Sequence, residues 1–77
     1  MLMANVSLLD TLQPRAQAAL CNSQVSELRA LCVEHREGSL VISGAVSSFY
    51  HKQLAQEVVR AVCKECEVEL TNTIRVR

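Results

Sequence analysis

The stretch that most constrains the fold is residues 40–48, LVISGAVSS, where a run of apolar residues meets a glycine and then two serines. This run predicts a strand over residues 39–46 with the even-numbered positions on one face. Gly44 interrupts that strand, and such a glycine usually marks a bulge or a close approach of another backbone, here of a helix packed on the sheet. Ser47 or Ser48 then caps a helix over residues 48–64. We therefore expect this strand and helix to organise the rest of the chain.

The segments that follow continue this pattern. The predicted helix has one apolar stripe, formed by Leu54, Ala55, Val58, Ala61 and Val62. Residues 67–77 then alternate between apolar and polar residues, which is the clearest strand pattern in the chain. Asn72 is the one polar residue in the apolar row, and we expect it to satisfy a loop backbone rather than to bind a ligand.

The first half of the chain supplies partners for these elements. Residues 12–21 predict a helix with Pro14 in its first turn, where the missing N–H is tolerated. Residues 1–10 have no clear period and are expected to form a flexible tail. Residues 26–35 predict a strand that a hairpin joins to residues 39–46, with Gly38 at the position that needs positive φ.

These elements follow one another in the order α-β-β-α-β. The hairpin makes the first two strands antiparallel, and the connecting helix makes the last two parallel. One apolar sheet face covered by two helices predicts an α+β two-layer sandwich with a three-stranded mixed sheet. The chain has 77 residues, so we expect one domain over residues 11–77.

Charge and hydropathy limit the possible partners. The formal net charge is +0, which argues against a nucleic-acid binder that works by neutralising phosphates. No segment reaches the roughly 20 apolar residues that a membrane span needs. The N-terminus is apolar without a basic start, so we expect an unexported, cytoplasmic protein.

Three segments recur in the order and spacing of a known family. Residues 38–46, GSLVISGAV, are similar to the pattern G-x-V-x-L-x-G-x-V, a helix with KQLAQEVV follows at 52–59, and VELTNTIRV at 68–76 is similar to V-x-N-x-I/L-x-V. From Leu28 onward the chain thus resembles the BON domain, a module of bacterial envelope and osmotic-stress proteins, secretins and channels. The resemblance implies an αββαβ fold that binds phospholipids or other proteins, and it makes Gly38, Gly44 and Asn72 structural.

The cysteines offer a different hypothesis. The four are Cys21, Cys32, Cys63 and Cys66, and in an unexported protein such thiols act as small hydrophobic residues. Cys63 and Cys66 form a C-x-x-C at the end of a predicted helix, where the dipole disfavours a thiolate. Zinc would need further ligands from Cys21, Cys32 or His35. We expect no metal and no cofactor, and the alternative is a small metal-binding or redox protein that uses Cys63 and Cys66 with Cys21 or Cys32.

Acid–base chemistry has few candidates. His35 and His51 are the two side chains whose ordinary pKa lies near neutrality. Neither has a Ser, Cys or Asp partner at a motif spacing, so we expect no catalytic residues and no enzymatic activity.

Six residues are candidates for an interaction surface. Phe49 and Tyr50 are the only aromatic residues, and we expect one ring to enter the core while the other is free to anchor a partner. The other four would lie on the open face of the last strand: Thr71, Thr73, Arg75 and Arg77. We expect a protein partner, an anionic membrane surface or a second copy of the chain to bind at this face or at the sheet edges.

Overall fold

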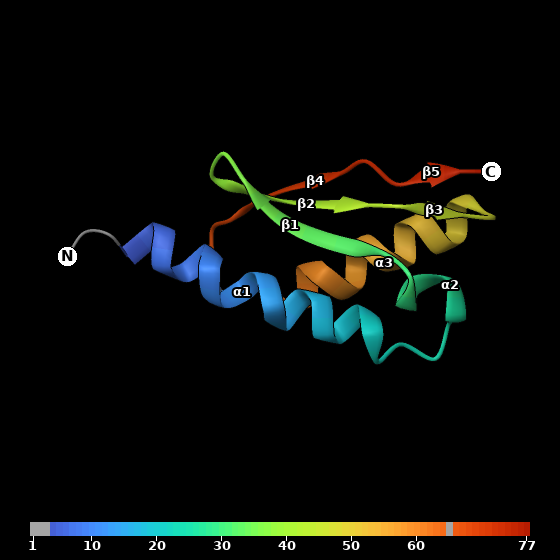
Figure 1. The fold of residues 1–77 in the computed structure, drawn as a ribbon, viewed down its shortest axis with the longest axis horizontal. Coiled ribbons are helices and arrows are strands. Elements are labelled where there is room, and N and C mark those ends of the chain that lie inside the picture. Colours follow the sequence, from blue (N-terminus) through green and yellow to red (C-terminus); the bar gives the residue numbers. More distant parts are fainter. Residues whose placement is uncertain (1–3, 65) are drawn as a thin grey trace.

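The sheet and the two long helices form two layers, with both helices on the same face of the sheet (Figure 1). The computed structural model describes residues 4–64 and 66–77, and side chains from residue 8 onward. In chain order the elements are α1 (Ala4–Cys21), α2 (Ser26–Arg29), β1 (Cys32–Arg36), β2 (Ser39–Ser43), β3 (Ala45–Val46), α3 (Phe49–Val62), β4 (Glu69–Asn72) and β5 (Arg75–Val76). The predicted α+β class is confirmed, and α2 is an addition to the expected order.

The strands pair as a mixed sheet. The order is β1-β2-β4, and β3 pairs with β5 beyond a break in both strands. β1 runs antiparallel to β2 through a tight hairpin whose Glu37 (φ 49°) and Gly38 (φ 83°) are both left-handed. β2 pairs in parallel with β4, and β3 with β5. The predicted hairpin and the parallel return through α3 are therefore confirmed.

Gly44 divides the strand predicted over residues 39–46 into β2 and β3. Its φ is 132°, and its carbonyl accepts the Arg75 N–H at 2.9 Å, so pairing resumes beyond the break. A Cβ at this position would lie 2.6 Å from Cδ2 of Leu31. The break in the strand at Gly44 is confirmed, but the expected approach of a helix backbone is wrong, because the close neighbour is the side chain of Leu31, which enters the core immediately before β1.

The core between helices and sheet is aliphatic. Its apolar members are Leu9, Leu12, Ala16, Leu20, Leu28, Leu31, Val33, Leu40, Ile42, Val46, Ala55, Val59, Cys63 and Ile74. On α3 the stripe is rotated from the predicted one, since Val59 is buried and Ala61 is exposed. Leu54, Val58 and Val62 pack at its margin.

The first helix starts earlier than its sequence predicts. α1 begins at Ala4, so residues 4–10 are helical and do not form the expected tail, while residues 1–3 lie outside the described part. The cause is tertiary packing, because Leu9 is buried and Leu8 packs against the core. Pro14 is consequently in the helix interior, where its missing N–H takes the Asp10 carbonyl out of the helical ladder.

The segment predicted as a strand over residues 26–35 is a short helix followed by a strand. α2 spans Ser26–Arg29, and β1 starts only at Cys32. Leu28 and Leu31 are both buried, which is the three-residue spacing of a helical turn. The strand prediction was wrong here because residues 27–31, ELRAL, are all favourable helix formers.

The last predicted strand, residues 67–77, is also broken. Thr73 donates from both its N–H and its Oγ1 to the Ile42 carbonyl, at 2.9 and 2.8 Å. Asn72 Oδ1 accepts the Ile74 N–H at 3.0 Å, and Asn72 Nδ2 donates to the Lys52 carbonyl at 3.3 Å. The expected role of Asn72, which was to satisfy loop backbone, is confirmed.

Candidate interaction surface

The two aromatic residues form the main exposed apolar feature of the described surface. Phe49 is 74% exposed and Tyr50 is 70% exposed, in the first turn of α3. The expectation that one ring enters the core was wrong, because the buried stripe of α3 begins only at Ala55. We call Phe49 and Tyr50 together the aromatic end.

The backbone beneath the aromatic end is held by a helix cap. Ser48 is the N-cap of α3, with an extended backbone, and its Oγ accepts the His51 N–H at 3.1 Å. This confirms the cap predicted at Ser47 or Ser48. The Tyr50 and His51 rings lie with their centroids 5.7 Å apart at a tilt of 49°. The cap therefore fixes the turn from which both aromatic side chains project.

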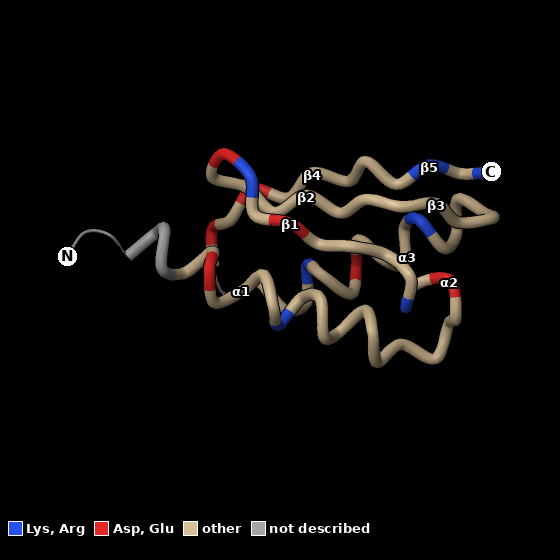
Figure 2. The backbone as a smooth tube through the Cα atoms, viewed as in Figure 1, with Lys and Arg blue, Asp and Glu red and all other residues tan. Residues whose placement is uncertain are grey.

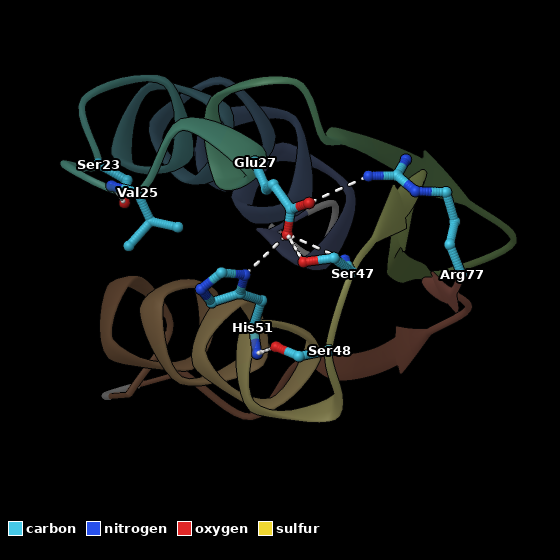
Figure 3. Close-up of polar contacts among 7 residues, drawn as sticks. All are labelled: Ser23, Val25, Glu27, Ser47, Ser48, His51 and Arg77. Atoms are coloured by element: carbon cyan, nitrogen blue, oxygen red, sulfur yellow. Dashed lines mark hydrogen bonds and ion pairs between the residues drawn. The ribbon is translucent and has the colours of Figure 1, made fainter.

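A single carboxylate ties this turn to the rest of the molecule. Glu27 Oε1 accepts the Ser47 N–H at 2.9 Å and the Ser47 Oγ–H at 3.0 Å, and lies 2.7 Å from His51 Nδ1. Glu27 Oε2 lies 3.0 Å from Nη2 of Arg77 (Figure 3). We call these four residues the Glu27 cluster, and they join α2, the loop before α3, α3 itself and the residue after β5.

The cluster changes the titration of its carboxylate. The pKa of Glu27 is lowered from 4.5 to about 2, first by the hydrogen bond from the Ser47 N–H and then by the contact with His51. Hydrogen bonds to the charged form favour that form, so Glu27 stays ionised in mildly acidic solution. The Glu27 side chain is only 22% exposed, whereas Arg77 is 62% exposed.

A serine, a histidine and a carboxylate meet here, but their connections differ from those of a nucleophilic triad. A triad needs the serine hydroxyl to give its proton to the imidazole. Ser47 Oγ instead donates to Glu27, and Ser48 Oγ accepts from the His51 backbone rather than contacting its ring. The arrangement holds the loop in place and does not activate either hydroxyl.

The open face of the sheet carries the other predicted surface residues. Thr71 and Arg75 lie on this face, while Arg77 reaches Glu27 and Thr73 Oγ1 is occupied by the Ile42 carbonyl. Glu34 and Arg36 of β1 form an ion pair of 2.7 Å at exposed positions. The six predicted residues are thus divided: Arg77 joins the Glu27 cluster beneath the aromatic end, and Thr71 and Arg75 lie along the sheet.

The two edges of the sheet differ. At the β1 edge, Gln17 of α1 donates to the Leu31 carbonyl at 2.8 Å and accepts the Val33 N–H at 2.8 Å, and Gln13 donates to the Val33 carbonyl at 2.6 Å. We call this the covered edge. On the other side β4 and β5 are the last strands of the described sheet, and we call their outer side the open edge.

The cysteines are free thiols in the described structure. Cys63 is buried, and burial raises its pKa, as does its neighbour Cys66. Cys21 and Cys32 are exposed at the end of α1 and the start of β1. Among the described side chains, no three His, Cys, Asp or Glu residues gather as a metal site would require, so the set needed by the metal-binding alternative is not assembled there.

The second histidine lies near the other end of the molecule. His35 Nδ1 is 3.1 Å from Oδ1 of Asp10, which ties β1 to α1. The two line an open depression of about 390 Å³, whose other lining residues are Gln13, Val33, Glu34 and Arg36. His35 and His51 each have a carboxylate partner, and neither has a nucleophile beside its ring among the contacts of the described residues.

Sequence reasoning missed the Glu27 cluster. The sequence pattern predicts a strand at Glu27, whereas the residue lies in the first turn of a short helix. The available signal was the run of helix-forming residues that starts at Glu27. The partners of Glu27 lie 20 to 50 residues away in sequence, at separations where local patterns carry no information.

Comparisons with known proteins add no relative. No protein-family model matches the chain, no curated protein is similar enough to match, and no solved structure matches. Within the described residues, no helix combines the length and the apolar character needed to cross a membrane.

Proposed function

We propose that this protein is a non-enzymatic interaction module, with BON-like architecture, that binds a protein partner through its aromatic end. The observation that carries the proposal is the exposure of Phe49 and Tyr50, at 74% and 70%, in a chain whose core is otherwise aliphatic. Large aromatic side chains contribute much of the energy of protein interfaces, and contiguous exposed apolar patches often mark interaction sites. The chain places its only two aromatics on the surface.

The base of the aromatic end supports this role. Ser48 caps the turn, and Glu27 holds Ser47 and His51, so the two rings project from a fixed backbone. A preorganised anchor loses less entropy on binding than a mobile one. Arg77, the cation of the Glu27 cluster, is paired with Glu27, which favours a protein partner over an anionic membrane surface. The four free thiols are consistent with a cytoplasmic location.

The test compares a variant that lacks both rings with a matched variant on the same helix. Phe49→Ala with Tyr50→Ala removes the anchor, whereas Gln53→Ala with Glu57→Ala changes two exposed residues that contact each other. We expect the control variant to capture the same proteins as the wild-type chain. The aromatic variant should bind these proteins with an affinity lower by about 30-fold or more. Both variants should keep wild-type stability to within about 0.5 kcal/mol, because all four side chains are exposed.

The outcomes separate the possible partners. Equal capture by the aromatic variant and the wild type would contradict the proposal. Binding to vesicles of anionic lipid that disappears with Phe49→Ala and Tyr50→Ala would reassign the aromatic end to a membrane surface.

A further inference from the structure

The C-terminal segment has the same order of polar and apolar residues on both sides of Asn72, with opposite charges at matching positions. Residues 67–77 read EVELTNTIRVR, with acidic residues before the centre and basic residues after it (Figure 2). Counting outward from Asn72, threonine matches threonine, leucine matches isoleucine, glutamate matches arginine and valine matches valine. A strand of this kind is complementary to a second copy of itself running in the opposite direction.

The backbone of this segment fixes which groups face the open edge. The N–H groups of Thr73, Arg75 and Arg77 donate to carbonyls of β2, β3 and the break between them, at 2.8 to 2.9 Å. Because successive residues of a strand direct their backbone groups to opposite sides, the even-numbered residues 70, 72 and 76 present theirs to the open edge. The described sheet has no further strand on that side.

We propose that the open edge pairs with a second copy of this chain, antiparallel, about a two-fold axis at Asn72. In this register Asn72 lies opposite its own copy, and Leu70 lies opposite Ile74 of the second copy. Asn72 and its copy form a hydrogen-bonded pair of the new ladder, which agrees with the direction of the Asn72 backbone groups. The Leu70–Ile74 pair contributes one bond, from the Leu70 N–H to the Ile74 carbonyl, because the Ile74 N–H is bonded to Asn72 Oδ1. The product is a continuous six-stranded sheet made of two three-stranded halves.

The side chains complement one another in the same register. Glu69 lies opposite Arg75 of the second copy, and Thr71 lies opposite Thr73, in the closer non-hydrogen-bonded pairs. Each charge pair occurs twice because the interface is isologous. A register shifted by two residues would place Glu69 opposite either Thr73 or Arg77, and Arg77 is already paired with Glu27, so the charges favour the register centred on Asn72.

The helix side of the open edge has room for the partner. A depression of about 240 Å³ lies beside β4, lined by Arg60, Cys63, Lys64, Cys66, Val68 and Leu70. In the proposed register Val76 of the second copy lies opposite Val68, next to this depression. Val68, Leu70 and Val76 are each only partly buried, and pairing would cover more of their apolar surface. The Ile74 N–H keeps its bond to Asn72 Oδ1 and takes no part in the ladder.

The experiment measures the mass of the protein by sedimentation equilibrium, using the full chain and three charge variants. We expect the wild type to dimerise and Arg75→Glu to weaken the dimer about tenfold or more, because two Glu–Glu oppositions replace two ion pairs. Glu69→Arg should weaken it similarly. An equimolar mixture of Glu69→Arg and Arg75→Glu should restore the dimer, since each charged side chain at position 69 then lies opposite a side chain of unlike charge at position 75 of the other copy. Arg15→Glu, an exposed residue of α1, is the matched control and should leave the dimer unchanged.

The association of the mixed variants tests the edge pairing independently of the proposed binding at the aromatic end. A wild-type chain that is monomeric up to its solubility limit would overturn it. So would a mixture that associates no better than its two components. Should either single variant fail to fold, the double variant Glu69→Arg with Arg75→Glu restores both pairs with inverted charge, and a monomeric double variant would equally overturn the proposal.

Discussion

At the β1 edge the outward backbone groups of Val33, and of Leu31 just before the strand, bond to the side-chain amides of Gln13 and Gln17. On the outer side of β4 and β5, no described strand pairs with the outward backbone groups. An unpaired edge is a template for another chain, so a small sheet must cover its edges or give them a partner. The covered edge is closed by neutral groups within the molecule. The open edge carries glutamates at one end and arginines at the other, a pattern that suits recognition of a partner.

The largest expected effect comes from Gly44, which seats Leu31 at the start of the covered edge. Gly44→Ala should lower the free energy of unfolding by about 3 kcal/mol, because a Cβ at φ 132° is strained and meets the buried Leu31 side chain at 2.6 Å. Urea denaturation measures the change. Gly38→Ala is the control, since φ is 83° but no atom lies within 4 Å, and it should cost about 1 kcal/mol. Equal losses in the two variants would show that Leu31 moves aside without cost.

The covered edge itself is tested by Gln17→Ala. This change leaves the Leu31 carbonyl and the Val33 N–H without their side-chain partner, at a cost of about 2 kcal/mol. Hydrogen exchange at the Val33 amide should become faster, because its acceptor is gone. Gln53→Ala, whose amide contacts only exposed Glu57, should cost less than about 0.5 kcal/mol. A Gln17→Ala protein as stable as Gln53→Ala would mean that water replaces the glutamine.

The smallest expected effect is a pH dependence that affects the end of the open edge and not the covered edge. The pKa of Glu27 in the folded protein is about 2, below its ordinary value of 4.5, so its stabilising contacts are fully present above pH 4.5 and are lost as the pH falls toward 2. Arg77, which follows β5 at the end of the open edge, should then lose its anchor, whereas the amides of Gln13 and Gln17 do not titrate. The protection of the Ser47 amide against hydrogen exchange, relative to the intrinsic rate at each pH, should fall between pH 4.5 and 2.5 by more than the protection of the Val33 amide. Equal change at both amides would contradict this assignment.

The features that the sequence predicts correctly are those with local causes. The left-handed turn at Gly38, the cap at Ser48, the break in the strand at Gly44 and the backbone role of Asn72 each depend on the intrinsic chemistry of one residue and its close neighbours in the chain. The α+β class follows in the same way from the hairpin and from the helix that returns the chain.

The features that the sequence does not predict depend on contacts between residues far apart in the chain. The start of α1 at Ala4 depends on how Leu8 and Leu9 pack against the core. The Glu27 cluster unites residues from four parts of the chain, and no periodicity encodes that meeting. The exposure of both aromatic rings depends on the rotation of α3 against the sheet, which buries Val59 and leaves the first turn outside.

The long reach of Glu27 also has a consequence for the order of folding. Its contacts close separations of 20 residues to Ser47, 24 to His51 and 50 to Arg77. Contacts between distant residues carry the largest loop-closure entropy and tend to form after local hairpins and helices. We therefore expect the base of the aromatic end to be completed late in folding, after the hairpin of β1 and β2. The surface that we propose for recognition would then reach its final form only once most of the chain has folded.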